Sequence, residues 1–202
     1  MSHPPGVAPP PGALIRPPIT YSFTSSDGLR QYAVPMRQWL ATNDKRFHGL
    51  HASAVVFNAS GTKALLLQRA AHDSMPGRWE PAGGAIDPGD ETILQGCARE
   101  LYEEAGLKAK RIVRQIGSGD PFTNRTGTHI FWRLAFEVEV EDTDDVTNDP
   151  NEHARWIWAS QKEIEEERRE EDGEEIPITT TRMKKTLLDA FHLKREAGEI
   201  QD

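Results

Sequence analysis

Three glutamates, Glu100, Glu103 and Glu104, lie close together in the middle of the chain. A helix would place them side by side, where like charges at i and i+4 repel by roughly 0.2–0.5 kcal/mol. Glu103 and Glu104 would also lie in its last turn, where the helix dipole disfavours anions. Two explanations fit these residues: a solvated acidic face, or a site for a hard divalent cation such as Mg²⁺ or Mn²⁺, which prefers clustered carboxylate oxygens.

The helix that carries the glutamates is predicted to run from Thr92 to Gly106. Thr92 and Gln95 form a capping-box pattern, and Gly106 suits the position after a helix C-terminus. At about 100° per residue the apolar side chains form one arc that would face a core. These side chains are Ile93, Leu94, Cys97, Ala98, Leu101 and Ala105. Cys97 is therefore predicted to pack in the core, and the glutamates lie at the edge of the arc.

Gly83 and Gly84 precede this helix and let backbone carbonyls approach a ligand closely. With RELYEEAGL (Arg99–Leu107), the segment resembles the Nudix hydrolase box: Gly, five residues, Glu, seven residues, then Arg-Glu-apolar-x-Glu-Glu-x-Gly-apolar. Counted from Glu91, the second half matches at every fixed position, but six residues separate Gly84 from Glu91. Counting from Asp90 corrects the first spacing and lengthens the second to eight. We interpret the extra residue as an insertion before the helix, as in fungal-type variants of the box.

The resemblance extends from about Leu50 to Glu165. It includes LLLQRA and GRWEPAGG before the box, and EHARWIW followed by ASQKEI after it. The resemblance implies a Nudix α/β/α sandwich with a mixed central β-sheet, so the predicted class is α/β (α+β).

The resemblance also implies roles for the residues of the box. Glu103 and Glu104 would be metal ligands together with the carbonyl of Gly83. Glu100 would be either a ligand or the base that deprotonates a metal-bound water. The implied cofactor is Mg²⁺ or Mn²⁺.

Other residues receive roles on weaker grounds. Arg99 would pair with Glu91 and hold the loop on the helix. Glu152 is a second candidate base, although its acidic surroundings fit a solvated loop equally well. Trp79, Phe122 and Trp132 are candidates to stack on a base, with core packing as the alternative. His153, Trp156 and Trp158 are predicted to have packing or hydrogen-bonding roles.

The implied reaction is hydrolysis of a diphosphate bond in a nucleoside diphosphate linked to another moiety, by attack of water on phosphorus. Two alternatives remain open: hydrolysis of a non-nucleotide diphosphate such as a prenyl diphosphate, and a non-catalytic module that senses a nucleotide. The sequence does not choose among substrates within the first class.

The composition restricts the class of partner. A net charge of −8 without a large Lys/Arg cluster argues against nucleic acid and anionic membranes, so a small diphosphate is the expected partner. One cysteine fits a reducing compartment, and the chain lacks an apolar run of membrane-spanning length, so we expect a cytoplasmic protein. A homodimer is left open, with residues 19–47 as a surface for exchange.

The chain is predicted to have three parts: a Pro-rich disordered tail (1–18), an N-terminal extension (19–47) and a hydrolase domain (48–202). Strands are predicted at 19–23, 51–58, 63–70, 110–116, 128–141 and 154–160, with 51–58 and 63–70 forming a hairpin. Helices are predicted at 34–41, 92–106, 161–170 and 182–195.

Overall fold

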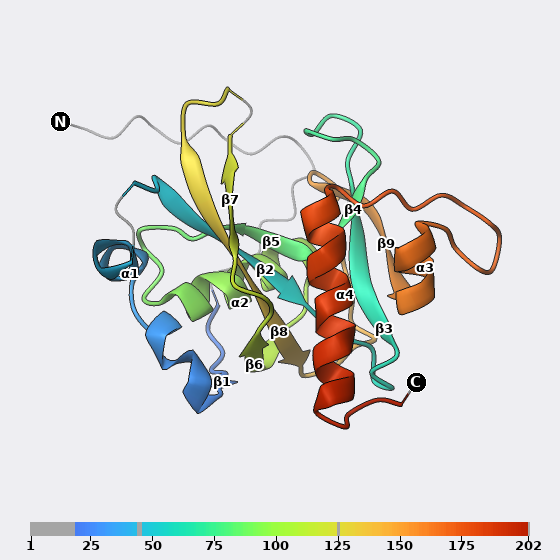
Figure 1. The fold of residues 1–202 in the computed structure, drawn as a ribbon, viewed down its shortest axis with the longest axis horizontal. Coiled ribbons are helices and arrows are strands. Elements are labelled where there is room, and N and C mark those ends of the chain that lie inside the picture. Colours follow the sequence, from blue (N-terminus) through green and yellow to red (C-terminus); the bar gives the residue numbers. More distant parts are fainter. Residues whose placement is uncertain (1–18, 44–45, 125, 202) are drawn as a thin grey trace.

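The computed structural model describes residues 19–43, 46–124 and 126–201, which fold into two β-sheets with helices on both sides (Figure 1). The predicted tail (1–18) lies outside the described residues. Along the chain the elements are β1 (Thr24–Ser25), η1 (Asp27–Tyr32), α1 (Met36–Thr42), β2 (Gly49–Val55), β3 (Lys63–Arg69), β4 (Trp79–Glu80), β5 (Ala82–Ala85), α2 (Ile93–Ala105), β6 (Ala109–Gln115), β7 (Asp120–Thr123), β8 (Ile130–Val140), β9 (His153–Ser160), α3 (Gln161–Glu166) and α4 (Thr181–Glu196).

The larger sheet is mixed and has the strand order β1-β6-β8-β2-β5, with β7 also paired to β8. Its central strands β2 and β8 are parallel to each other. Strand β5 is antiparallel to β2, and β6 is antiparallel to β8 but parallel to β1. The smaller sheet has the order β4-β3-β9 and is antiparallel. The predicted mixed α/β class with a mixed central sheet is therefore confirmed.

The predicted hairpin between β2 and β3 exists only at its turn, where Phe57 and Ala64 form an isolated bridge. Beyond the bridge the two strands enter different sheets: β2 lies between β5 and β8, and β3 lies between β4 and β9. Both strands are buried along most of their length, so each needs neighbours on both edges. The hairpin prediction was wrong because pairing with distant strands replaces local pairing.

Two hydrophobic cores lie on opposite faces of the large sheet. Leu50, Ala52 and Leu134 belong to the first core, which α2 covers. Val55 and Ala135, from the alternate positions of the same strands, belong to the second core, which α4 covers. Figure 1 shows α4 in front of the sheet and α2 behind it, so the sheet is enclosed by helices on both faces.

Residues between Ile19 and Leu40 pack onto the first core. The Tyr21 hydroxyl donates to the carbonyl of Ala98 at 3.3 Å and accepts from the amide of Ala109 at 3.2 Å. Tyr32 and Trp39 are buried in the same core. Among the described residues, no helix combines the length and the apolar character needed to cross a membrane.

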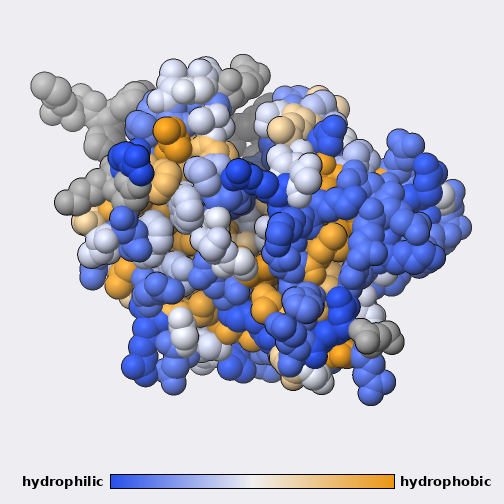
Figure 2. Space-filling view, in the orientation of Figure 1, coloured by the Kyte–Doolittle hydropathy of each residue, from blue (hydrophilic) through white to orange (hydrophobic). Residues whose placement is uncertain are grey.

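The acidic run at residues 163–175, after β9, forms a hydrophilic part of the surface at the right of Figure 2. Ser160 and Glu163 form a complete capping box at the start of α3. The helix ends at Glu166, earlier than the predicted Glu170, because Glu167 adopts a left-handed conformation with φ 50°. Glu165 and Glu166 are exposed, whereas Glu163 and Ile164 of the same helix are buried.

Helix α2 begins and ends as the sequence predicts. The Thr92 hydroxyl oxygen accepts from the amide of Gln95 at 3.0 Å, and Gly106 adopts φ 72° after the last turn. The Gln95 side chain accepts from the amide of Glu91 at 2.5 Å, one residue before the position expected for a capping box. Cys97 is fully buried, and burial raises its pKa to about 12, which confirms its packing role.

Replacing the cap should destabilise the protein without abolishing its fold. Thr92→Ala removes the hydroxyl acceptor, and we expect a loss of about 1 kcal/mol in the free energy of unfolding. Urea unfolding followed by circular dichroism measures the change. Thr92→Ser, which keeps an oxygen at the same place, is the control and should lose much less; equal losses would contradict the capping role.

Candidate active site

Glu104 forms the contact that joins α2 to the edge of the large sheet. The residue is only 6% exposed, and its carboxylate accepts from the amide of Gly83 in β5 at 2.7 Å. Gly83 is paired with Ser53 of the neighbouring strand β2. A carboxylate is thus held at the sheet edge by a backbone donor.

The two glycines of β5 allow this close approach. A Cβ atom on Gly83 would lie 2.3 Å from the carbonyl oxygen of Ala52, so no larger residue fits between the strands. A Cβ atom on Gly84 would lie 2.3 Å from Oε2 of Glu100. Glu100 therefore packs directly against the backbone of β5, and the glycine pair serves both strand packing and the placement of a carboxylate.

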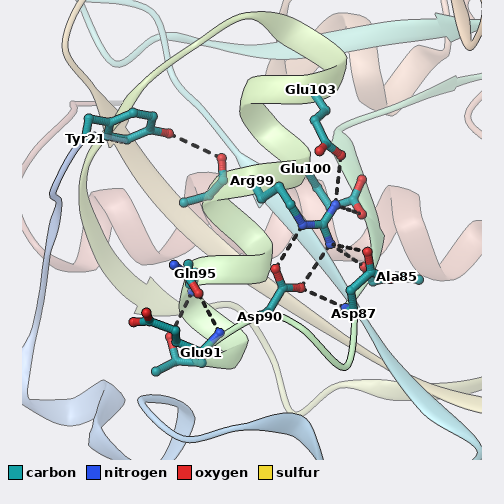
Figure 3. A network of polar contacts seen from close by, with 11 residues as sticks. Tyr21, Ala85, Asp87, Asp90, Glu91, Gln95, Arg99, Glu100 and Glu103 are labelled. Carbon is teal, nitrogen blue, oxygen red and sulfur yellow. Dashed lines mark hydrogen bonds and ion pairs between the residues drawn. The ribbon is translucent and has the colours of Figure 1, made fainter. Parts of the chain in front are cut away.

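Arg99 is the centre of a polar network that connects the helix to the preceding loop (Figure 3). Its Nε donates to Asp90 Oδ1 at 2.9 Å, and one terminal nitrogen donates to the carbonyl of Ala85 at 2.9 Å. The other terminal nitrogen donates to Glu100 Oε1 and to Glu103 Oε2, each at 2.8 Å. Arg99 thereby holds two of the three glutamates as well as the loop.

The partner of Arg99 in the loop is Asp90, so the predicted pairing with Glu91 was wrong. Asp90 is buried, and its carboxylate also accepts from the amide of Asp87 at 2.8 Å. Gly96 makes room for it, because a Cβ atom there would lie 2.6 Å from Asp90 Oδ2. Glu91 is exposed. The extra residue therefore lies between the ion-paired acid and the helix, and it turns Glu91 to solvent.

The segment before and at the start of β9 also contributes to the site. A cavity of about 540 Å³ is lined by Glu100, Glu104 and Glu152, together with Gly83 and His153. Glu152 is exposed, and its charge acts on both Glu100 and Glu104. The fold thus brings together Glu100, Glu104 and Glu152, while Glu103 is held at the rim by Arg99 with 42% of its side chain exposed.

Burial and mutual repulsion shift the acids of this cavity. Burial raises the pKa of Glu100 to about 7, against the opposing effect of Arg99. Burial also raises the pKa of Glu104 well above its ordinary value, and the charges of Glu152, Glu100 and Glu80 add to that rise. Negative charge on Glu104 is therefore costly in the protein alone.

Glu80, Arg69 and His51 also belong to the site and were not predicted. Glu80 is ion-paired with Arg69 and lies near His153; burial works to raise its pKa, but these neighbours bring it below its ordinary value. His51 lines the cavity from β2, on the strand face opposite the first core. For His51 the sequence signal was a polar residue at an alternating position in an otherwise apolar strand.

The three aromatic residues predicted to bind substrate have different positions. Trp79 is 0% exposed within the second core, so its prediction as a stacking residue was wrong. Trp132 lies on the face of β8 that packs against the first core and lines a separate cavity. Its ring is tilted against that of Phe47, with ring centres 5.0 Å apart. Phe122 lines a second cavity, of about 630 Å³, which shares His51, Arg69 and Gly83 with the first.

The remaining predicted packing residues behave as expected. Trp156 and Trp158 pack against the first core, with ring centres 6.5 Å apart. His153 is buried beside Glu80. The cavity is lined by the carboxylates of Glu100, Glu104 and Glu152 as well as by histidines, and carboxylate oxygens suit a hard divalent cation. Within the described residues, no three acidic, histidine or cysteine side chains are already gathered as a metal cluster.

Comparison with known proteins identifies the family. The family model described as NUDIX domain matches residues 47–178, well over half of the chain. The chain belongs to the Nudix family. Its mixed-sheet α/β fold is the one that the resemblance of the box implied.

Two curated relatives match this Nudix hydrolase over short segments. A CTP pyrophosphohydrolase from Escherichia coli (strain K12) is 49% identical over 47 residues, which cover 23% of this chain and 34% of that protein. An m7GpppN-mRNA hydrolase from Bos taurus is 41% identical over 56 residues, which cover 27% of this chain and 18% of that protein. The chain therefore spans about a third or less of the curated relatives it matches.

A solved structure supports the fold over a longer range. The MutT protein from Methanosarcina mazei Go1 superposes with a TM-score of 0.54 at 23% identity, covering 77% of this chain and 99% of that one. At this identity the likeness shows the fold alone.

Asp90 should be more important for stability than Glu91, although the two carboxylates are adjacent. Asp90→Asn weakens a buried ion pair with Arg99, so we expect a loss of about 2–3 kcal/mol in the free energy of unfolding. Glu91→Gln is the matched control and should change it by less than about 0.5 kcal/mol. Urea unfolding compares them, and a larger loss for Glu91→Gln would contradict the assignment.

The raised pKa of Glu100 should make the metal-free protein less stable as the pH rises. Between about 4.5 and about 7 the folded state holds a proton on Glu100 that the unfolded state has released, so the free energy of unfolding falls with pH. Glu100 contributes at most about 3 kcal/mol to this fall.

Urea unfolding of wild type and Glu100→Gln in EDTA at about pH 5 and pH 8 isolates this contribution. The advantage of Glu100→Gln over wild type should increase at the higher pH, while the exposed Glu171→Gln should show no such change. An advantage that is equal at both pH values would mean that Glu100 has an ordinary pKa.

Proposed function

We propose that this Nudix hydrolase cleaves a diphosphate bond in a nucleoside diphosphate linked to another moiety, by attack of water on phosphorus. The products are a nucleoside monophosphate and the phosphate of the other moiety. The names of both curated relatives support this class, because a CTP pyrophosphohydrolase and an m7GpppN-mRNA hydrolase act on nucleotide derivatives.

The observation that carries the proposal is the group of acids around Glu104. Glu104 is 6% exposed and shares one cavity with Glu100 and Glu152, and the charge of Glu80 also acts on it. Such an arrangement costs stability unless positive charge is supplied from outside. A divalent cation with the phosphates of a substrate meets this need, whereas a solvated acidic face would leave the acids exposed.

The residues present fit Mg²⁺ or Mn²⁺. Glu103, Glu104, Glu100 and the Gly83 carbonyl would hold the ion, which would compete with Arg99 for Glu100 and Glu103. When bound, such an ion neutralises phosphate charge and lowers the pKa of coordinated water. The positive charge would also lower the raised pKa values of Glu100 and Glu104, so both carboxyl groups should ionise when metal and substrate are present.

The chain's own residues then supply orientation and proton transfer. Glu100 and Glu152 both reach the cavity and are the two candidates for the base that accepts the proton of the attacking water. Arg99 fixes the helix and the loop relative to each other and limits the positions of Glu100 and Glu103. The neighbouring cavity, lined by His51, Phe122 and Arg133, accommodates the rest of the substrate.

Polar groups in the wall of that second cavity favour a nucleotide over a prenyl diphosphate. His51, Ser53 and Arg133 offer hydrogen-bonding groups that an isoprenoid chain cannot use. The complete set of box glutamates favours an enzyme over a sensor without activity. Hydrolysis of a prenyl diphosphate would give other products in the same assay, and a sensor without activity would give none.

The test is product analysis on a panel of nucleoside triphosphates, ADP-ribose, dinucleoside polyphosphates and prenyl diphosphates, with Mg²⁺ or Mn²⁺ and with EDTA. Turnover of a nucleotide that EDTA abolishes is the expected result. Glu103→Gln/Glu104→Gln should remove metal-dependent turnover, and Glu171→Gln, an exposed acid far from the box in sequence, is the control.

Single variants separate the two candidate bases. The base should lose roughly 10²- to 10⁴-fold in kcat when changed to Gln, and the other acid should lose less, so Glu100→Gln and Glu152→Gln are compared directly. Prenyl diphosphate turnover alone, or nucleotide binding without products, would contradict the proposal.

A further inference from the structure

The wall of the second cavity contains three polar atoms that the fold leaves without partners. They are His51 Nδ1, Ser53 Oγ and Arg133 Nε, each buried and without a hydrogen bond among the described residues. His51 and Ser53 point from the same face of β2, and His51 is paired in register with Arg133 of β8. Buried polar groups normally have partners, so three on one wall indicate a surface that a ligand completes.

Arg133 differs from the other arginine of this cavity. Arg69 is fully engaged: it is ion-paired with Asp73 and Glu80 and donates to the carbonyl of Ser74. For Arg133, no ion pair or hydrogen bond is found within the described part of the chain, and its guanidinium lies over the Phe122 ring at 4.7 Å. Phe122 thus holds the guanidinium by a cation–π contact while its hydrogen-bond donors remain available.

The other polar groups near Arg133 are committed or uncharged. Asn124 accepts from the amides of Thr128 and His129, and the Thr180 hydroxyl oxygen caps α4. Burial lowers the pKa of His51 to about 4, with Arg133 adding to the shift, so this imidazole is neutral at pH 7. Among the described residues of this cavity, Arg133 is therefore the unpaired cation. It lies with neutral polar groups, the ion-paired Glu80, and apolar Met75 and Met183.

This lining suits a planar neutral ring with acceptors better than a phosphate. A phosphate requires several donors or cations, and the Glu80 carboxylate on the same cavity would repel it. A guanidinium fork pairs with two adjacent acceptors in one plane. Cytosine presents O2 and N3, and guanine presents O6 and N7, whereas adenine and uracil alternate donors with acceptors along the corresponding edges.

We propose that Arg133 reads the base of the nucleotide, pairing its guanidinium with two adjacent acceptors and so favouring cytosine or guanine over adenine and uracil. The inference rests on the proposed function, because it requires a nucleotide beside the box glutamates. Phe122 is then a positioning residue for Arg133, which replaces its predicted role as a surface for stacking.

Equilibrium binding of CMP, GMP, AMP and UMP tests the inference separately from catalysis. Wild type should bind CMP or GMP more tightly than AMP and UMP, by about 5- to 150-fold, as expected for one bidentate contact to a base. Arg133→Lys keeps the charge but loses the fork, so this preference should fall to within about threefold. Arg133→Gln should move the preference toward AMP, because an amide pairs with one donor and one acceptor.

Arg182→Lys is the matched control, since Arg182 lies on α4 outside this cavity and contacts Asp120. It should keep the wild-type order of the four nucleotides. Equal weakening of all four by Arg133→Lys and Arg133→Gln would show that Arg133 binds phosphate and would overturn the inference.

The two proposals fail in different ways. Wild type without base preference in binding, but with metal-dependent nucleotide hydrolysis, refutes the role of Arg133 and leaves the proposed function intact. A clear base preference without hydrolysis of any nucleotide supports Arg133 and refutes the proposed function.

Discussion

The close approach of α2 to the edge strand β5 is the constraint on which the rest of the site depends. Glu104 accepts from the Gly83 amide, and Glu100 packs on the backbone of Gly84. Both contacts need strands and helix to approach without intervening side chains, and glycine is the residue that permits this. One turn before Glu100, on the same side of the helix, Gly96 makes room for Asp90 in the same way.

This approach has an electrostatic cost that explains the arrangement around it. Glutamates at the end of a helix oppose its dipole, and burial raises the pKa values of Glu100 and Glu104 further. Arg99 offsets part of the cost by bonding Glu100, Glu103 and Asp90 at once. Arg99 does not bond Glu104, whose carboxylate accepts from the Gly83 amide. Glu104 is therefore the acid that an external cation would stabilise most.

In the proposed function, chemistry takes place in one cavity and recognition of the base in the other. One contains the acids, and the other contains His51, Ser53, Phe122 and Arg133, with His51, Arg69 and Gly83 lining both. Strand β2 connects them: its residues at alternate positions fill the first core, while His51 and Ser53 face the cavities. The same strand therefore fixes the sheet and lines the site.

The sequence by itself determined what depends on short-range physics. The boundaries of α2, the burial of Cys97 and the grouping of the glutamates follow from capping residues and helical period. The long alternating strand β8 follows from the period of two. The spacing of the box was also sufficient to indicate the family, and the match to residues 47–178 confirms it.

Only the tertiary structure decided which distant residues meet. Glu91 and Asp90 are both acids before a helix, and the space beside Gly96 determines which of them pairs with Arg99. Trp79 and Phe122 are both aromatic, but strand pairing buries the first and places the second on a cavity. Arg133 and His51 become neighbours because two strands far apart in sequence pair in parallel, and local sequence does not encode that register.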